Sequence, residues 1–190
     1  EVTEVERKAA EDATLSACAR EVYLIEEPIA AAIGARIPIH EASGFMIVDI
    51  GGGTAEIAVI SLGGIVTQKS LRIAGNELNE NILNYVQENF NVLIGVRTAE
   101  EIKIKIGTVL ASRERIEFRV RGRNLLDGLP TEIAITNEQV REAILPTVMT
   151  IVENIINTIE ATPPELVADI HERGMVLAGG GSLMRGLPEL

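Results

Sequence analysis

The most informative stretch of this sequence is Val48-Asp49-Ile50-Gly51-Gly52-Gly53-Thr54. Asp49 ends an apolar run, and an ionised carboxylate in that setting needs a cation, hydrogen-bond donors or water beside it. The three glycines allow positive φ and close approach of the main chain, so consecutive N–H groups can converge on an anion. This pattern predicts a phosphate-binding loop. A plain tight turn is the alternative that a glycine triplet alone leaves open.

The residues around the loop indicate which kind of phosphate loop it is. Residues 56–60 have the pattern of a strand, whereas a Rossmann turn or a P-loop opens into a helix. Three apolar runs lie at 45–50, 57–62 and 65–73, with links of only a few residues between them. They must pair as antiparallel neighbours, because a parallel crossover needs a dozen or more residues. We therefore expect a phosphate hairpin.

A second glycine cluster contains Gly179, Gly180, Gly181 and Ser182, and follows a predicted strand at 175–178. We expect a helix to begin there, and N–H groups at a helix start can hold a phosphate or lie against a flat base. Glycine also ends strands for steric reasons alone. Two clusters at the ends of two strands favour binding more than either does by itself.

The remaining elements follow from local signals. Helix starts are predicted at four threonines that precede Glu or Gln by three positions, the capping-box spacing: Thr3, Thr98, Thr136 and Thr162. We also expect a short helix at 30–33, helices from Gly75 and from Pro163, a buried strand at 22–25, and strands at 115–121 and 131–135.

Several charged residues are candidates for chemistry. Glu27 precedes Pro28 in a rigid connection and is able to polarise an attacking water, although an exposed turn carboxylate is the alternative. Glu100, Glu101 and Lys103 lie in the first turns of a predicted helix, where the helix dipole favours carboxylates in any case. A role for them in nucleoside binding therefore competes with a structural explanation.

Composition limits the possible partners and the setting of the protein. The net charge of −11 disfavours nucleic acid, and the single cysteine, Cys18, cannot form an internal disulfide. No apolar run approaches the roughly 18 residues of a membrane span. A reducing, cytoplasmic setting fits best.

The sequence begins without Met and ends where a helix is expected to start, so we expect a piece of a longer protein.

Several segments resemble the MreB/Mbl family of bacterial actin homologues. The resemblance covers essentially the whole chain and is carried by seven stretches, at 24–34, 48–54, 58–66, 97–107, 121–130, 162–166 and 177–187. The glycine loop alone is shared by actins, sugar kinases and heat-shock chaperones. The other stretches are specific to the MreB branch.

The resemblance implies an α/β fold of the actin-like ATPase type, with ribonuclease-H-like subdomains, a mixed sheet and a small α+β insertion. Residues 1–44 would then close a first large subdomain. Residues 45–77 and 137–190 would form the second, nucleotide-binding subdomain, and residues 78–136 the inserted small one.

It also implies roles for individual residues. Asp49 would hold Mg²⁺ through water, and Gly51, Gly52 and Gly53 would wrap the terminal phosphates of ATP. Glu27 and Thr54 would position the hydrolytic water. The adenosine would contact two groups, namely Glu100, Glu101 and Lys103 on one side and Gly179, Gly180, Gly181 and Ser182 on the other. Position 55 is Ala, where many relatives are expected to have a second Thr.

The implied function is that of an ATP-binding, filament-forming cytoskeletal protein that determines rod cell shape by organising cell-wall synthesis. It would hydrolyse ATP slowly, assemble with itself and with cell-wall elongation proteins, and lie in the cytoplasm at the inner face of the bacterial membrane. Membrane contact would come only from parts outside this chain. The family's first phosphate hairpin is not in this sequence, so we expect the isolated chain to bind ATP weakly or not at all and to be inactive.

Two alternatives remain from the residues alone. A monomeric ATPase of the chaperone or sugar-kinase type uses the same phosphate hairpin, although nothing here resembles its substrate domain. A nucleotide-free structural relative is the other, and the joint presence of Glu27, Asp49 and Thr54 argues against it.

Overall fold

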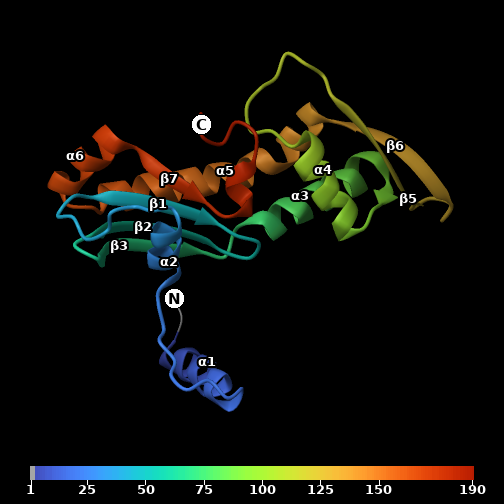
Figure 1. Ribbon diagram of the computed structural model, residues 1–190. Coiled ribbons are helices and arrows are strands. Elements are labelled where there is room, and N and C mark those ends of the chain that lie inside the picture. The colour runs from blue at the N-terminus through green and yellow to red at the C-terminus, as the bar shows by residue number, and fades with distance from the viewer. Residues whose placement is uncertain (1–2) are drawn as a thin grey trace.

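A mixed four-stranded sheet forms the centre of the computed structural model, which describes residues 3–190 (Figure 1). Strands β1 (Phe45–Ile50), β2 (Ala55–Ser61) and β3 (Gly64–Leu71) form the predicted antiparallel meander. Strand β7 (Met175–Ala178) adds to β1 in parallel, so the order is β3-β2-β1-β7. The predictions of the meander and of a mixed sheet are confirmed.

Helices cover both faces of this sheet. Side chains alternate along β1, so that Met46 and Val48 face the cluster beneath α5 (Asn137–Glu160) and α6 (Pro164–Arg173). Ile47 faces the other way and packs with Ala32 of α2 (Glu27–Gly34). Because both faces of β1 and β2 are buried, these two strands are largely apolar, with Asp49 and Glu56 as their only charged residues, which is why they appear as nearly continuous apolar runs in the sequence.

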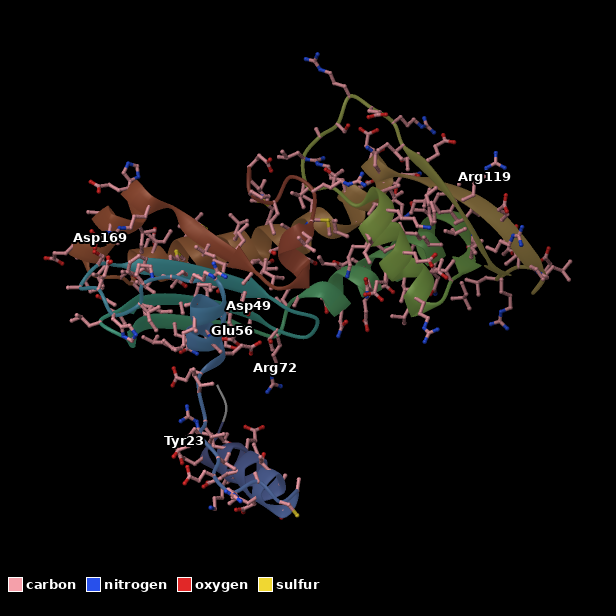
Figure 2. The ribbon with its side chains drawn as sticks, viewed as in Figure 1. Tyr23, Asp49, Glu56, Arg72, Arg119 and Asp169 are labelled. Carbon is pink, nitrogen blue, oxygen red and sulfur yellow. The ribbon has the colours of Figure 1, made fainter. Side chains whose placement is uncertain are left out.

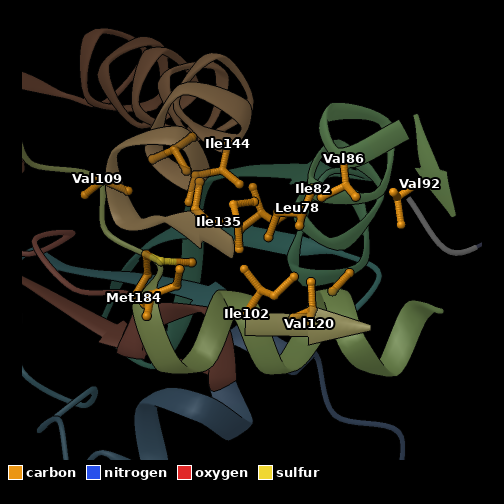
Figure 3. Close-up of a cluster of buried hydrophobic side chains, with 14 residues drawn as sticks. Leu78, Ile82, Val86, Val92, Ile102, Val109, Val120, Ile135, Ile144 and Met184 are labelled. Atoms are coloured by element: carbon orange, nitrogen blue, oxygen red, sulfur yellow. The ribbon is translucent and has the colours of Figure 1, made fainter. Parts of the chain in front are cut away.

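A second hydrophobic core lies beside the sheet (Figure 3). It is enclosed by α3 (Gly75–Phe90), α4 (Val96–Ile106) and a small sheet in the order β4-β5-β6, formed by β4 (Val92–Leu93), β5 (Glu117–Asn124) and β6 (Pro130–Thr136). Helix α5 runs from this core to the central sheet and contributes to both. The buried apolar side chains of α3 are Leu78, Ile82 and Val86, a helical stripe that follows the 3.6-residue period.

Two of the four predicted helix caps are confirmed. Thr3 caps α1 (Glu4–Ser16) and Thr136 caps α5, each in a complete capping box. The other two predictions are wrong. Helix α4 begins at Val96 with Gly95 as its N-cap, because the Ala99 N–H closes the first turn onto the Gly95 carbonyl at 3.1 Å.

At Thr162, the hydroxyl donates instead to the Thr158 carbonyl at 2.7 Å, so the end of α5 uses the group that was expected to cap α6. Pro163 occupies the N-cap position of α6 and offers no side-chain acceptor. A capping box competes with other local side-chain-to-backbone hydrogen bonds, and here the threonine hydroxyl bonds back to the carbonyl four residues earlier.

The predicted buried strand at 22–25 is wrong as well. These residues form an extended connection between α1 and α2, and Tyr23 and Leu24 are 83% and 53% exposed. Within residues 3–190 no strand pairs with this segment, and an unpaired segment has no ladder to bury it. Helix α1 projects from the rest of the chain at the far end of this connection (Figure 1).

The helix expected at the second glycine cluster is also not formed. Only the 3₁₀ turn η1 (Gly180–Leu183) follows β7. Beyond it the Arg185 carbonyl accepts the Val109 N–H at 2.9 Å and Arg185 pairs with Thr108, and residues 186–189 then form turns. This contact ties the end of the chain to the segment that follows α4.

Candidate functional site

The glycine loop closes the hairpin between β1 and β2. The Gly51 N–H donates to the Thr54 carbonyl at 2.9 Å, while the carbonyls of Gly51 and Gly52 accept the first N–H groups of α3, from Gly75 at 3.0 Å and Asn76 at 2.7 Å. The loop is therefore held through its carbonyl oxygens. The N–H groups of Gly52 and Gly53 donate to no protein group in the part of the chain described, and both residues are exposed. This arrangement leaves two adjacent donors for an anion.

The second glycine cluster packs against the end of β1. Gly179 has φ +79°, and a Cβ there would lie 2.3 Å from the Ile50 carbonyl oxygen and 2.4 Å from Oδ1 of Asp49. A Cβ on Gly181 would lie 2.3 Å from Cγ2 of Ile50. Only glycine permits this approach, so the fold brings both predicted glycine clusters together around Asp49.

Asp49 lies in a row of residues that crosses the sheet. In the strand register it stands opposite Glu56 on β2 and beside Ala178 on β7, and Glu56 in turn stands opposite Ser70 on β3. Figure 2 shows Asp49 and Glu56 close together near α2. Carboxylates directly opposite each other destabilise a strand pair unless a cation or hydrogen-bond donors offset their charge.

The surroundings of Asp49 fit a water-coordinated Mg²⁺. Within residues 3–190 no three His, Cys, Asp or Glu side chains gather as a metal-ligand set. Mg²⁺ commonly keeps several waters and binds through one or two carboxylates together with substrate phosphates, so a single half-buried Asp beside exposed loop N–H groups suits that mode.

A hollow of about 580 Å³ opens beside the glycine loop and contains both predicted catalytic residues. Glu27, the exposed first residue of α2, and Thr54 both line it. Its other walls come from β3, α1 and the segment before α2, and Arg72 lines it from the end of β3 (Figure 2). The structure thus brings Glu27 and Thr54 to one cavity from positions 27 residues apart.

Lys103 reaches the base of the loop from α4. Its Nζ donates to the Gly75 carbonyl at 2.8 Å, and Gly75 in turn donates to Gly51. Burial lowers the pKa of the Lys103 ammonium, and the charge of Glu100 partly opposes that effect. Glu100 and Glu101 are exposed on the same helix. Of the three predicted nucleoside contacts on α4, Lys103 alone has a hydrogen bond that links it to the base of the glycine loop within the described residues.

Sequence reasoning missed two residues of this region. Glu56 lines the hollow although it is 9% exposed, and the Ser70 hydroxyl donates to its Oε1 at 2.6 Å. A signal was available, because Glu56 is the only charged residue in the otherwise apolar run from Ala55 to Ile60. A charge in a strand that is buried on both faces points to a specific partner.

Comparison with known proteins identifies the family. A family model described as MreB/Mbl protein matches residues 1–190. The chain belongs to the MreB/Mbl family. Among its relatives are the cell shape-determining protein MreB of Escherichia coli K12, 50% identical over 188 residues, and the cell shape-determining protein Mbl of Bacillus subtilis, 47% identical over 189 residues.

The chain spans about half the length of these MreB/Mbl relatives. It covers 54% of the Escherichia coli protein and 57% of the Bacillus subtilis protein, while the alignments include 99% and 100% of this chain. The segments that the relatives have beyond the matched region are therefore not represented here.

Solved structures agree with the family assignment. The structure of MreB5 of Spiroplasma citri bound to AMPPNP matches 99% of this chain and 56% of its own, with a TM-score of 0.95 and 38% identity. The MamK double helical filament matches 97% of this chain and 55% of its own, with a TM-score of 0.78 and 26% identity. The predicted actin-like fold is confirmed for this member of the MreB/Mbl family.

Proposed function

We propose that this chain is part of an ATP-binding, filament-forming protein that determines bacterial cell shape. The observation that carries the proposal is the convergence of the two glycine clusters around Asp49, with Glu27 and Thr54 in the adjoining hollow. The names of the relatives support the cellular role, since both are cell shape-determining proteins. The structure of MreB5 bound to AMPPNP and the MamK filament support nucleotide binding and self-assembly.

In this proposal the chain's own residues bind and orient the nucleotide. The N–H groups of Gly52 and Gly53 would donate to the terminal phosphates, and Asp49 would hold the hydration shell of Mg²⁺, which neutralises charge on the transferred phosphoryl group. Glu27 would accept a proton from the attacking water and Thr54 would orient it. Preorganised donors of this kind stabilise charge that develops in the transition state.

The nucleoside would lie between α4 and η1. Glu100, Glu101 and Lys103 would border it on one side, and Gly179, Gly180, Gly181 and Ser182 on the other. The contact between Val109 and Arg185 supports this arrangement, because it joins the segment after α4 to the segment after η1.

The same proposal divides the chain into three parts. Residues 1–44 close a first large subdomain, residues 45–77 and 137–190 form the second one, and residues 78–136 form the inserted small one. The separate core around α3 and α4 supports this division.

The proposed setting is the cytoplasm at the inner face of the bacterial membrane, together with cell-wall elongation proteins. No helix within residues 3–190 is both long and apolar enough to cross a membrane. A monomeric ATPase of the chaperone or sugar-kinase type is not favoured, because the family match is to MreB/Mbl over the whole chain.

Sedimentation of the full-length protein that contains this chain tests the proposal. We expect pelleting into regular filaments with Mg²⁺ and ATP, and less pelleting with ADP or without nucleotide. A protein that binds ATP and stays monomeric well above cellular concentration would contradict the filament assignment. A protein that binds no nucleotide under any condition would contradict the ATP assignment.

A further inference from the structure

We propose that Glu56 is a further catalytic residue, which orients the hydrolytic water, and that Ser70 is a positioning residue that holds Glu56 in place. This inference rests on the proposed function and deepens it. It concerns a carboxylate that neither the family resemblance nor the assigned roles of Glu27 and Thr54 use.

Burial is the first observation behind the proposal. Glu56 is 9% exposed and lies in a strand with apolar residues before and after it. A carboxylate removed from water is costly unless its oxygens are paired, so its retention in this strand calls for an explanation. The Ser70 hydroxyl, directly opposite in the register, satisfies Oε1 at 2.6 Å.

The second oxygen distinguishes a catalytic role from a purely structural one. Oε2 accepts no hydrogen bond within residues 3–190. Within the same residues, the one buried side-chain oxygen or nitrogen without a hydrogen-bond partner is Oδ1 of Asn79, so Oε2 of Glu56 is not a buried atom. Oε2 is therefore open to solvent, and the space it borders is the hollow that Glu56 lines. A cross-strand pair that served stability alone would have no need of an open carboxylate oxygen.

Glu56 shares the hollow with the two residues that the proposed function assigns to the water. Thr54 immediately precedes β2, two residues before Glu56, and both residues line the hollow. Glu27 begins α2 and lines the same hollow. A water between the three side chains would donate one hydrogen to Glu27 and the other to Oε2 of Glu56, while Thr54 contacts its oxygen.

The step itself is ordinary hydrolysis. The water oxygen forms a bond to the terminal phosphorus, the bond from that phosphorus to the bridging oxygen breaks, and ADP leaves with the bridging oxygen. The water proton taken up by Glu27 passes to the phosphate product. Glu56 fixes the orientation of the water without itself being consumed, and small errors in such orientation cost large factors in rate.

The test measures the phosphate-release rate, nucleotide affinity and thermal stability of the full-length protein with Mg²⁺ and ATP. In Glu56→Gln the amide oxygen still accepts the Ser70 hydroxyl while the charge is lost, and we expect a fall of about 10-fold to 100-fold in rate with affinity changed less than about 2-fold. Ser70→Ala should lower the rate less, and Ser70→Thr, which keeps the hydroxyl, should restore it. The exposed Glu88→Gln on α3 is the matched control, with an unchanged rate.

Two results would overturn the inference. One is a wild-type rate in Glu56→Gln, and the other is a rate that falls only in proportion to the folded fraction, as a structural pair would give. Failure of the wider proposal looks different, because the wild-type protein itself would then fail to bind or hydrolyse ATP. If Glu27→Ala loses hydrolysis while Glu56→Gln keeps it, only the role of Glu56 is wrong.

Discussion

Replacing Gly179 with Ala should both destabilise the protein and disrupt its nucleotide site. The residue has φ +79° and ψ 166°, a region essentially restricted to glycine, so strain alone costs about 1–3 kcal/mol. The new Cβ would lie 2.3 Å from the Ile50 carbonyl oxygen and 2.4 Å from Oδ1 of Asp49, and overpacking of this kind costs about a further 1–3 kcal/mol. The two contributions together predict a loss of about 2–6 kcal/mol.

Chemical denaturation of the full-length protein, with and without Mg²⁺ and ATP, measures this loss. The matched control is Gly180→Ala, because a Cβ there meets nothing within 4 Å and the change should stay within about 1 kcal/mol. Relief of the clash requires β7 to move away from β1, which displaces Asp49, so ATP binding should weaken in Gly179→Ala. Equal stability of the two variants would refute the packing argument.

Four further predictions concern the core, Lys103, Glu27 and Asp49. Ile102→Ala should cost about 2–5 kcal/mol in denaturant unfolding because the side chain is fully buried, whereas Ile104→Ala, at a 67% exposed site on the same helix, should cost less than about 1 kcal/mol. Burial lowers the pKa of Lys103, so between that pKa and 10.5 the unfolded state binds more protons and stability rises with pH. Lys103→Met should lack this rise in a pH series of unfolding curves, and identical pH profiles for the two proteins would contradict it. In single-turnover assays, Glu27→Ala should retain ATP binding and lose hydrolysis by about 10²-fold or more, and a wild-type rate would exclude its assigned role. Asp49→Ala should weaken Mg²⁺-dependent binding itself, which calorimetry with and without Mg²⁺ would detect.

Local patterns account for the elements that were predicted correctly. The three apolar runs at 45–73 are joined by links too short for a parallel crossover, so their antiparallel pairing followed from chain geometry alone. Thr136 and Gln139 satisfy each other's backbone groups within one helical turn, and no distant residue competes for them. The apolar stripe of α3 follows from its helical period in the same way.

The predictions that failed have two causes, namely competing local hydrogen bonds at the helix caps and, for residues 22–25, the lack of a partner strand within residues 3–190. The hydroxyl of Thr162 is used by the end of the preceding helix, and Gly95 begins α4 before Thr98 can cap it. The segment around Tyr23 has strand-like composition but no partner strand within residues 3–190, so its side chains remain exposed. Hydrophobicity alone does not bury a segment, because burial requires a surface to pack against.

The sequence by itself determined the glycine hairpin loop after Asp49 and membership of the MreB/Mbl family, because both depend on short stretches of residues that are contiguous in the chain. Tertiary structure alone decided that Gly179 would meet Ile50, and that the Lys103 ammonium would hold the Gly75 carbonyl. It also placed Glu56 opposite Ser70 with one oxygen open to the hollow. Strand register and helix packing set these contacts, and both arise only when segments from distant parts of the chain pack together.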